Sequence, residues 1–150
     1  MLSQLHTNEL QRIADYLSDT EDPWWVLGSA AMALIEIDPG DIRDIDVLVS
    51  ERDADALIRK HSLTNMADGG TDGFRSNFFL TPNLGQVPVE IMAGYQIRTA
   101  GAWQVVEPKT RLRIPVGSAA IFVPDRDEQM HFLKRLGRPK DRDRLQRFQA

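Results

Sequence analysis

The segment from residue 44 to residue 49, DIDVLV, places two aspartates at alternating positions of a short apolar run. Residues i and i+2 of a β-strand point to the same side, so Asp44 and Asp46 would project together, about 6 to 7 Å apart along the strand. Like charges at this spacing repel each other, and burial adds to the cost. A chain with this segment therefore needs a fold that brings a cation to the two aspartates.

The residues before this strand predict a strand, a turn and a helix. Residues 24–27, WWVL, are aromatic and branched, as buried strands often are. Gly28-Ser29 then turns the chain into residues 30–37, whose alanine, methionine and leucine content favours a helix. The turn sequence DPGD at residues 38–41 leads back to the strand of the two aspartates.

The rest of the chain continues as a mixture of helices and strands. Helical spacing of apolar residues predicts helices over 8–18, capped by Thr7 or Asn8, and over 51–61, and Pro124 leads into a closing helix. Strands are predicted over 74–81 and 87–92, joined by a hairpin turn, and over 103–106, 112–116 and 121–123. Pro88 cannot donate a ladder hydrogen bond, which favours either an edge position for its strand or a strand that is open on one side at Pro88. The order of elements predicts an α+β fold with a mixed β-sheet flanked by helices.

Composition sets the broad class of the protein. The chain has 150 residues, 42% of them hydrophobic, which predicts a single domain over residues 1–150. A net charge of −4 argues against a surface built for non-specific binding to nucleic acid or anionic membranes. The absence of cysteine excludes disulfides, thiolate metal sites and a cysteine nucleophile. No signal peptide or bilayer-spanning run is visible, so we expect a cytoplasmic protein without membrane association.

A third acid downstream is suited to join the aspartate pair. Glu90 is the polar residue at the centre of the apolar segment VPVEIM, where an adjacent strand would place it beside Asp44 and Asp46. Magnesium prefers carboxylate oxygens and keeps coordination positions free for water and phosphate. Each acid also has a plain structural explanation, because Asp44 can pair with Arg43, Asp46 can cap a turn and Glu90 can face water.

Gly28-Ser29 supplies the second half of the predicted chemistry. A glycine allows close approach of the backbone to a ligand, and the first N–H groups of the following helix favour phosphate. The Ser29 hydroxyl adds a further contact. A phosphate-binding turn followed by three acids predicts a site for a metal-bound nucleoside triphosphate.

Taken in order, Gly28-Ser29, the DIDVLV strand and VEI around Glu90 resemble the nucleotidyltransferase superfamily with the DNA polymerase beta fold, especially its small single-domain bacterial members. The segment LKRLGRPKDRDRL, residues 133–145, also resembles a Lys then Arg-Pro-Lys-Asp pattern near the end of some of these proteins. The resemblance covers most of the chain. It implies a nucleotidyltransferase-like fold.

The resemblance also implies roles for individual residues. Asp44, Asp46 and Glu90 would bind a divalent metal, Mg²⁺ or Mn²⁺, and Glu90 would act as the base toward an attacking hydroxyl. Gly28 and Ser29 would hold the phosphates. Lys134 is similar to a lysine that neutralises phosphate charge in such proteins.

The implied reaction is transfer of a nucleoside monophosphate from a nucleoside triphosphate to a hydroxyl acceptor. A protein, a small molecule and a nucleic-acid end all stay open as acceptors, and a homodimer or a partner protein would complete the site. The chain departs from the pattern at Asp41 and Ile42, where many members carry an arginine and a hydroxyl residue. This departure favours an alternative, a catalytically inactive binding or regulatory module, and the resemblance extends to members of toxin–antitoxin pairs.

The segment from His131 to Arg147 is rich in lysine and arginine, in contrast to the acidic remainder of the chain. Such a run is usually a solvated helical face, and it would also steer a triphosphate or an RNA toward a site. The three histidines have no spacing typical of a zinc site.

Overall fold

The computed structural model describes residues 2–149. At its centre lies a four-stranded sheet in the order β1 (Trp25–Leu27), β2 (Ile45–Leu48), β5 (Val89–Ala93) and β4 (Phe78–Leu80). β2 and β5 are parallel, whereas each outer strand is antiparallel to its neighbour. The predicted α+β fold with a mixed sheet is confirmed.

Five helices and two smaller sheets surround this centre in the described part of the chain. The helices are α1 (Gln4–Tyr16), α2 (Gly28–Leu34), α3 (Glu51–His61), α4 (Arg126–Leu136) and α5 (Pro139–Arg147). The smaller sheets contain β3 (Phe74–Arg75), β6 (Gln96–Thr99) and β7 (Ala102–Val105), and β8 (Leu112–Val116) with β9 (Ala119–Val123). None of the helices in residues 2–149 combines the length and the apolar character needed to cross a membrane.

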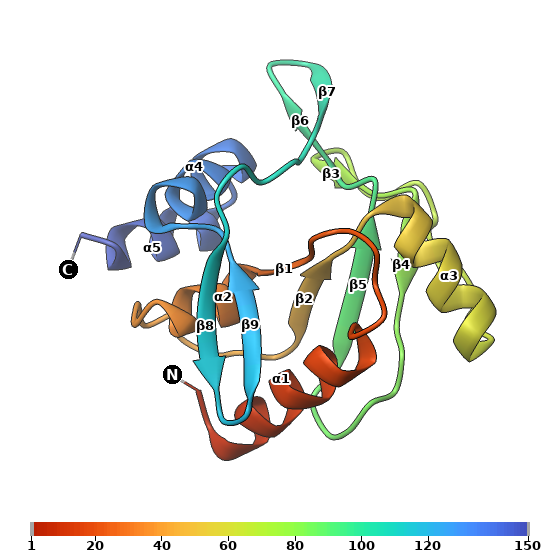
Figure 1. Ribbon diagram of the computed structural model, residues 1–150. Coiled ribbons are helices and arrows are strands. Elements are labelled where there is room, and N and C mark those ends of the chain that lie inside the picture. Colours follow the sequence, from red (N-terminus) through yellow and green to blue (C-terminus); the bar gives the residue numbers. More distant parts are fainter. Residues whose placement is uncertain (1, 150) are drawn as a thin grey trace.

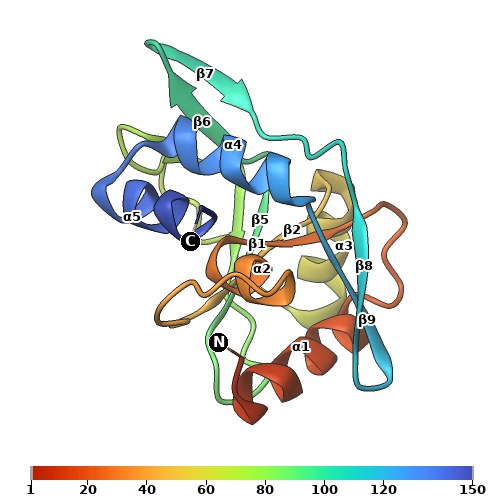
Figure 2. The ribbon, with the colours of Figure 1, turned by 90° about the vertical axis from the view of Figure 1, so that its left-hand side faces the viewer.

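The C-terminal helices and the β6–β7 hairpin lie together at one end of the molecule. Figure 1 shows the hairpin projecting from the top, with α4 and α5 on the left and α3 on the right. In the side view of Figure 2, α4 runs between the base of this hairpin and α2. α1 packs against β8 and β9 at the opposite end.

One face of the central sheet is fully apolar. Strand register aligns Val26 with Val47 and Val47 with Ile91, and none of the three is more than 1% exposed. Leu10 and Ile13 of α1 belong to the same core cluster. Because side chains alternate along a strand, the residues between these positions must point to the other face.

The opposite face carries the acids. Register aligns Leu27 with Asp46 and Asp46 with Glu90, one residue out of phase with the core row. A slip of one residue would move the acids into the core and the valines out of it, so burial of the apolar row fixes the position of the polar row.

Of the two predictions for the strand around Pro88, the edge position is wrong, but an open side at Pro88 agrees with the register, in which β4 pairs with β5 only over Ile91–Ala93. β5 is an interior strand between β2 and β4. The ladder begins at Val89, and Pro88 contributes only its carbonyl oxygen, which accepts a 2.9 Å hydrogen bond from the Ile45 amide. A proline immediately before the first paired residue therefore costs the sheet no donor.

Other boundaries also differ from the predictions. The helix over 51–61 is confirmed, with Ser50 as its N-cap, but the first helix begins at Gln4 because Ser3, not Thr7 or Asn8, caps it. The strand predicted over 74–81 is divided into β3 and β4, and β6 was not predicted. The closing helix is two helices, separated where Gly137 adopts a φ of 62° and Pro139 begins α5.

Candidate active site

The structure brings the three predicted acids together. Asp46 on β2 and Glu90 on β5 are direct partners in the parallel ladder, and Asp44 comes one residue before β2 on the same side as Asp46. One carboxylate oxygen from each acid lies within 4.8 Å of the others. All three side chains are half-buried, so the cluster is accessible from one side of the sheet.

Nearby positive charge offsets only a small part of the repulsion within the cluster. Burial, the charge of Asp44, and a hydrogen bond and like charge from Glu90 raise the pKa of Asp46 to about 7, against a smaller opposing effect of Lys140. A carboxyl that is difficult to ionise in this setting favours a bound cation. The donor set fits a hard divalent metal such as Mg²⁺, because all three ligand atoms are carboxylate oxygens.

Gly28 lies directly against the acid cluster. Its φ is +67°, a conformation that glycine adopts without strain, and a Cβ built on it would lie 3.0 Å from Asp46 Oδ2. Both facts require glycine at this position. Ser29 follows in the first turn of α2 and is 7% exposed. The Gly28-Ser29 turn and the acids thus share one wall.

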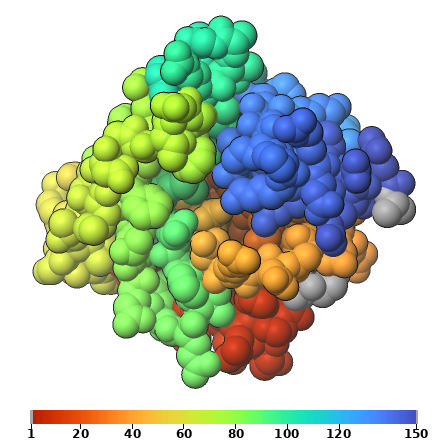
Figure 3. Space-filling model, turned by 180° about the vertical axis from the view of Figure 1, so that it is seen from behind, coloured from red at the N-terminus to blue at the C-terminus, as the bar shows by residue number. Residues whose placement is uncertain are grey.

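A cavity of about 250 Å³ opens above these residues. Its sheet side includes Gly28, Ser29 and the three acids, and its opposite side is formed by α4 and α5. The remaining wall is apolar and aromatic and includes Phe74, Phe79 and Tyr95. Figure 3 shows a hollow between the C-terminal helices and the segment that leads into β4.

Lys134, predicted to contact phosphate, does not line this cavity. It is exposed in the last turn of α4. The cations at the cavity are Arg138, Lys140 and Arg144, all from the α5 region. The break at Gly137 redirects the chain, so a lysine that precedes the break and one that follows it face different surroundings.

Sequence reasoning also missed a buried ion pair that positions α5. Asp141 is completely buried and accepts hydrogen bonds from Arg138 Nε at 2.6 Å and Arg138 Nη2 at 3.0 Å. The guanidinium carbon lies 5.4 Å from the centre of the Phe74 ring. Gly137 followed by Pro139 marks the helix end and the new helix start in the sequence, but it does not indicate the burial of Asp141.

Comparison with solved structures identifies the fold. A candidate nucleotidyltransferase from Thermotoga maritima superimposes with a TM-score of 0.77 at 23% sequence identity, over 99% of this chain and 95% of that protein. The lincosamide antibiotic adenylyltransferase LnuA, bound to lincomycin, has a TM-score of 0.61 at 13% identity, over 95% and 96% of the two chains. This chain has the nucleotidyltransferase fold.

A third structure agrees with this assignment. ANT(2″)-Ia in complex with adenylyl-2″-tobramycin has a TM-score of 0.58 at 11% identity, over 95% of this chain and 86% of that one. No protein-family model matches the sequence, and no curated protein matches it. The predicted nucleotidyltransferase-like fold is therefore confirmed by structure rather than by sequence similarity.

Proposed function

We propose that the chain is a metal-dependent nucleotidyltransferase, which moves a nucleoside monophosphate from a nucleoside triphosphate to a hydroxyl acceptor. The observation that carries the proposal is the acid cluster, with three carboxylate oxygens within 4.8 Å of one another beside the Gly28-Ser29 turn. The nucleotidyltransferase fold supports it. A bound Mg²⁺ or Mn²⁺ would supply charge neutralisation for the phosphates.

In this proposal the chain's own residues perform separate tasks. Asp44, Asp46 and Glu90 hold the metal, and the backbone N–H groups at Gly28 and Ser29 contact phosphate oxygens. Lys140 lies at the cavity and replaces Lys134 as the cation that offsets phosphate charge, whereas the charge of Arg138 is balanced by Asp141. The Arg138–Asp141 pair fixes the direction of the guanidinium.

The transfer step follows from these positions. The acceptor hydroxyl oxygen attacks the α-phosphorus and forms a new P–O bond, while the bond from that phosphorus to the bridging oxygen breaks. Pyrophosphate leaves with the bond electrons, and the hydroxyl proton passes to the Glu90 carboxylate. Electrostatic stabilisation of the phosphoryl group by fixed cations contributes most in such reactions.

Calorimetric titration tests the nucleotide site. ATP and GTP are titrated into the wild type with and without Mg²⁺, and into D44N/D46N after folding is verified by circular dichroism. We expect metal-dependent binding that the variant loses. Absence of binding to the folded wild type would contradict the proposal for the isolated chain.

A second candidate is a nucleotide-binding or partner-binding module without catalysis, as in one half of a toxin–antitoxin pair. The observation that favours it is Ile42. An isoleucine has no hydroxyl to offer a phosphate, and its side chain, 9% exposed, packs into the core instead. This candidate is supported if the protein binds nucleotide but releases no pyrophosphate with every hydroxyl acceptor that is tested.

A further inference from the structure

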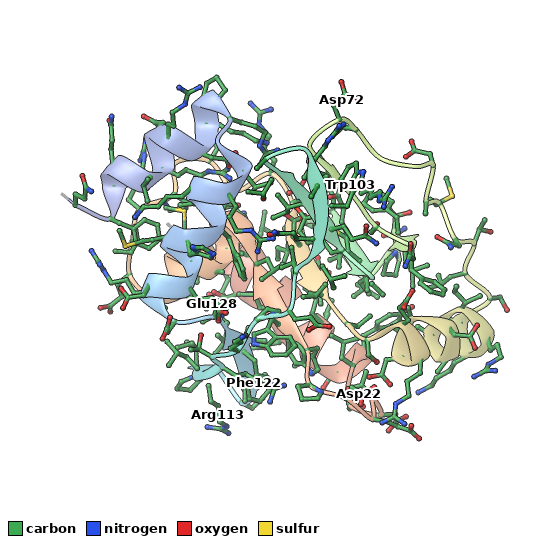
Figure 4. The ribbon with its side chains drawn as sticks, turned by 90° about the horizontal axis from the view of Figure 1, so that it is seen from above. Asp22, Asp72, Trp103, Arg113, Phe122 and Glu128 are labelled. Atoms are coloured by element: carbon green, nitrogen blue, oxygen red, sulfur yellow. The ribbon has the colours of Figure 1, made fainter. Side chains whose placement is uncertain are left out.

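One edge of the β6–β7 hairpin has no partner strand within residues 2–149. The order of its sheet is β3-β6-β7, so β7 pairs with β6 on one side only. Figure 1 shows the hairpin projecting from the top of the molecule, and Figure 4 shows it from above with Trp103 labelled on it. The free edge of β7 is therefore accessible to another chain.

The ladder between β6 and β7 shows which backbone groups are free on this edge. Hydrogen-bonded and non-hydrogen-bonded pairs alternate in an antiparallel ladder. At the base of the hairpin, the Val106 amide donates to the Tyr95 carbonyl at 2.8 Å. Counted along the register from this bonded pair, Trp103 and Val105 fall in the pairs without hydrogen bonds to β6. Arg98, opposite Trp103, donates its amide away from β7, as this pattern requires. The N–H and C=O groups of Trp103 and Val105 therefore point outward from the free edge.

The β7 edge lacks the features that usually prevent a free edge from pairing. Exposed edges are commonly protected by charged residues or by proline. β8 follows this rule, since it contains Arg113 and Pro115. β7 has the sequence AWQV, without charge or proline, and Val105 is 54% exposed. This contrast indicates that β7 is suited to accept another strand.

The free groups of β7 are complementary to those of a second β7 that runs antiparallel to it. A twofold axis through Gln104 places Trp103 of each copy opposite Val105 of the other. Both residues have outward backbone groups, so each of these pairs can exchange two hydrogen bonds. The two three-stranded sheets then join into one across the axis. The contact uses the same surface on both copies, as a twofold dimer requires.

The side chains at this contact also match. Val105 of one copy lies beside Trp103 of the other, and an aromatic residue opposite a β-branched one stabilises antiparallel strands. Arg75 stacks over the Trp103 ring at 4.2 Å and holds it in place. At the axis, Gln104 Oε1 accepts a 3.3 Å hydrogen bond from Arg135. The Gln104 amide nitrogen is then left to donate to Oε1 of Gln104 in the other copy.

No like charges meet directly across this contact. β7 itself is uncharged, and both β7 strands separate Arg98 of one copy from Arg98 of the other, by at least about 14 Å. The same register brings the hairpin tip of one copy, Ala100-Gly101, to Glu107 and Pro108 of the other. These two residues line a cavity of about 330 Å³, so there is room for the small residues of the tip.

We propose that β7 is a dimerisation edge, and that its partner is β7 of a second copy of this chain, paired antiparallel about Gln104. The proposal does not depend on the proposed reaction. The contact covers only the four residues of β7 in each chain, so the dimer is weak and its population depends on protein concentration. β6, the next strand, contributes Ile97 to the cavity of the candidate active site, so the dimer holds one wall of that cavity in each copy.

Sedimentation velocity and amide hydrogen exchange on the same samples test the proposal. Both are measured on the full chain from about 5 µM to about 1 mM. We expect the sedimentation coefficient to rise from that of a monomer toward that of a dimer. Over the same range, we expect exchange of the Trp103 and Val105 amides to slow at least about tenfold, because these amides are hydrogen-bonded only in the dimer. The Gln104 amide, which faces β6 in both states, should change less.

Two variants at one position separate the backbone contact from the side chain. V105P removes an outward N–H of β7 but none of the hydrogen bonds to β6, and we expect it to weaken dimerisation at least about tenfold. V105T keeps that N–H and a β-branched side chain, so it is the matched control, and we expect a loss of no more than about threefold. Exchange of the Val106 amide, which bonds to Tyr95, verifies that the hairpin is intact in both variants.

Three outcomes would overturn the β7 dimer. The first is a chain that stays monomeric up to about 1 mM. The second is a dimer in which the Trp103 and Val105 amides exchange as fast as in the monomer, since the contact then lies elsewhere. The third is equal dimerisation of V105T and of V105P with an intact hairpin. If V105P disrupts the hairpin, exchange of the two wild-type amides decides alone.

Discussion

The two faces of the central sheet are built from the same strands and serve opposite purposes. Val47 and Ile91 on one face are at most 1% exposed and belong to the core. Asp46 and Glu90, their immediate neighbours in sequence, form the acid cluster on the other face. The comparison shows that one alternating pattern determines both which residues form the core and which residues form the candidate site. The acids occupy their positions because their neighbours are buried on the opposite face.

The polar face is expected to respond most strongly in activity. D46N removes a central carboxylate, so we expect nucleotidyl transfer to fall at least about a hundredfold. The same change removes a buried negative charge that Asp44 and Glu90 repel. We therefore expect it to raise the free energy of unfolding at pH 8 by about 1 to 3 kcal/mol. Pyrophosphate release and urea denaturation measure the two effects. A loss of both activity and stability would contradict the division between the faces.

The apolar face is expected to respond in stability alone. I91A leaves a cavity in the core beside an intact Glu90, and we expect the free energy of unfolding to fall by about 3 kcal/mol. Nucleotide affinity of the folded fraction should not change. Urea denaturation with and without nucleotide and Mg²⁺ measures both quantities, and E90Q is the matched variant from the opposite face. If E90Q lost as much stability as I91A, the proposed difference between a stabilising apolar face and a functional polar face would be wrong.

A pH titration sharpens the comparison without changing the core. The pKa of Asp46 rises from 3.8 to about 7 on folding, so between these values the native state retains a proton that the unfolded chain releases. The stabilising contribution of that proton is present below pH 4 and is lost as the pH rises through 7. We expect the stability of the metal-free wild type to fall relative to D46N over this window, by about 2 kcal/mol. Parallel curves for the two proteins would exclude this effect.

The smallest expected effect concerns the helices that cover the polar face. Lys140 lines the first cavity and opposes the raised pKa of Asp46, whereas Lys134 is exposed outside it. We expect K140M to weaken nucleotide binding about fivefold and K134M to have no effect. Calorimetric titration of both variants with the same nucleotide shows which of the two lysines contributes to nucleotide binding.

The sequence predicted the sheet side of the site because that side depends on local periodicity. Alternation placed Asp44 and Asp46 on one side of a strand, and the apolar neighbours of Glu90 placed it on an adjacent strand. The interior position of β5 was missed because a proline before the first ladder residue has no effect on pairing.

The helix side could not be predicted in the same way. Lys134 and Lys140 differ in their surroundings only because α4 ends at Gly137, which turns the chain before α5. The fully buried Asp141 had no local signal of burial, since its partner Arg138 and the walls around it come together only in the folded chain. The cavity beside Trp25, Leu48 and Val105 likewise combines residues from segments far apart in sequence.

The parallel pairing of β2 with β5 has a consequence for how the protein folds. These strands are separated along the chain by α3, β3 and β4, so their ladder must close a long loop before any of its hydrogen bonds form. Asp46 and Glu90 meet only when this loop closes, and their mutual repulsion opposes the closure. A divalent ion that binds the finished cluster will therefore slow unfolding more than it speeds folding.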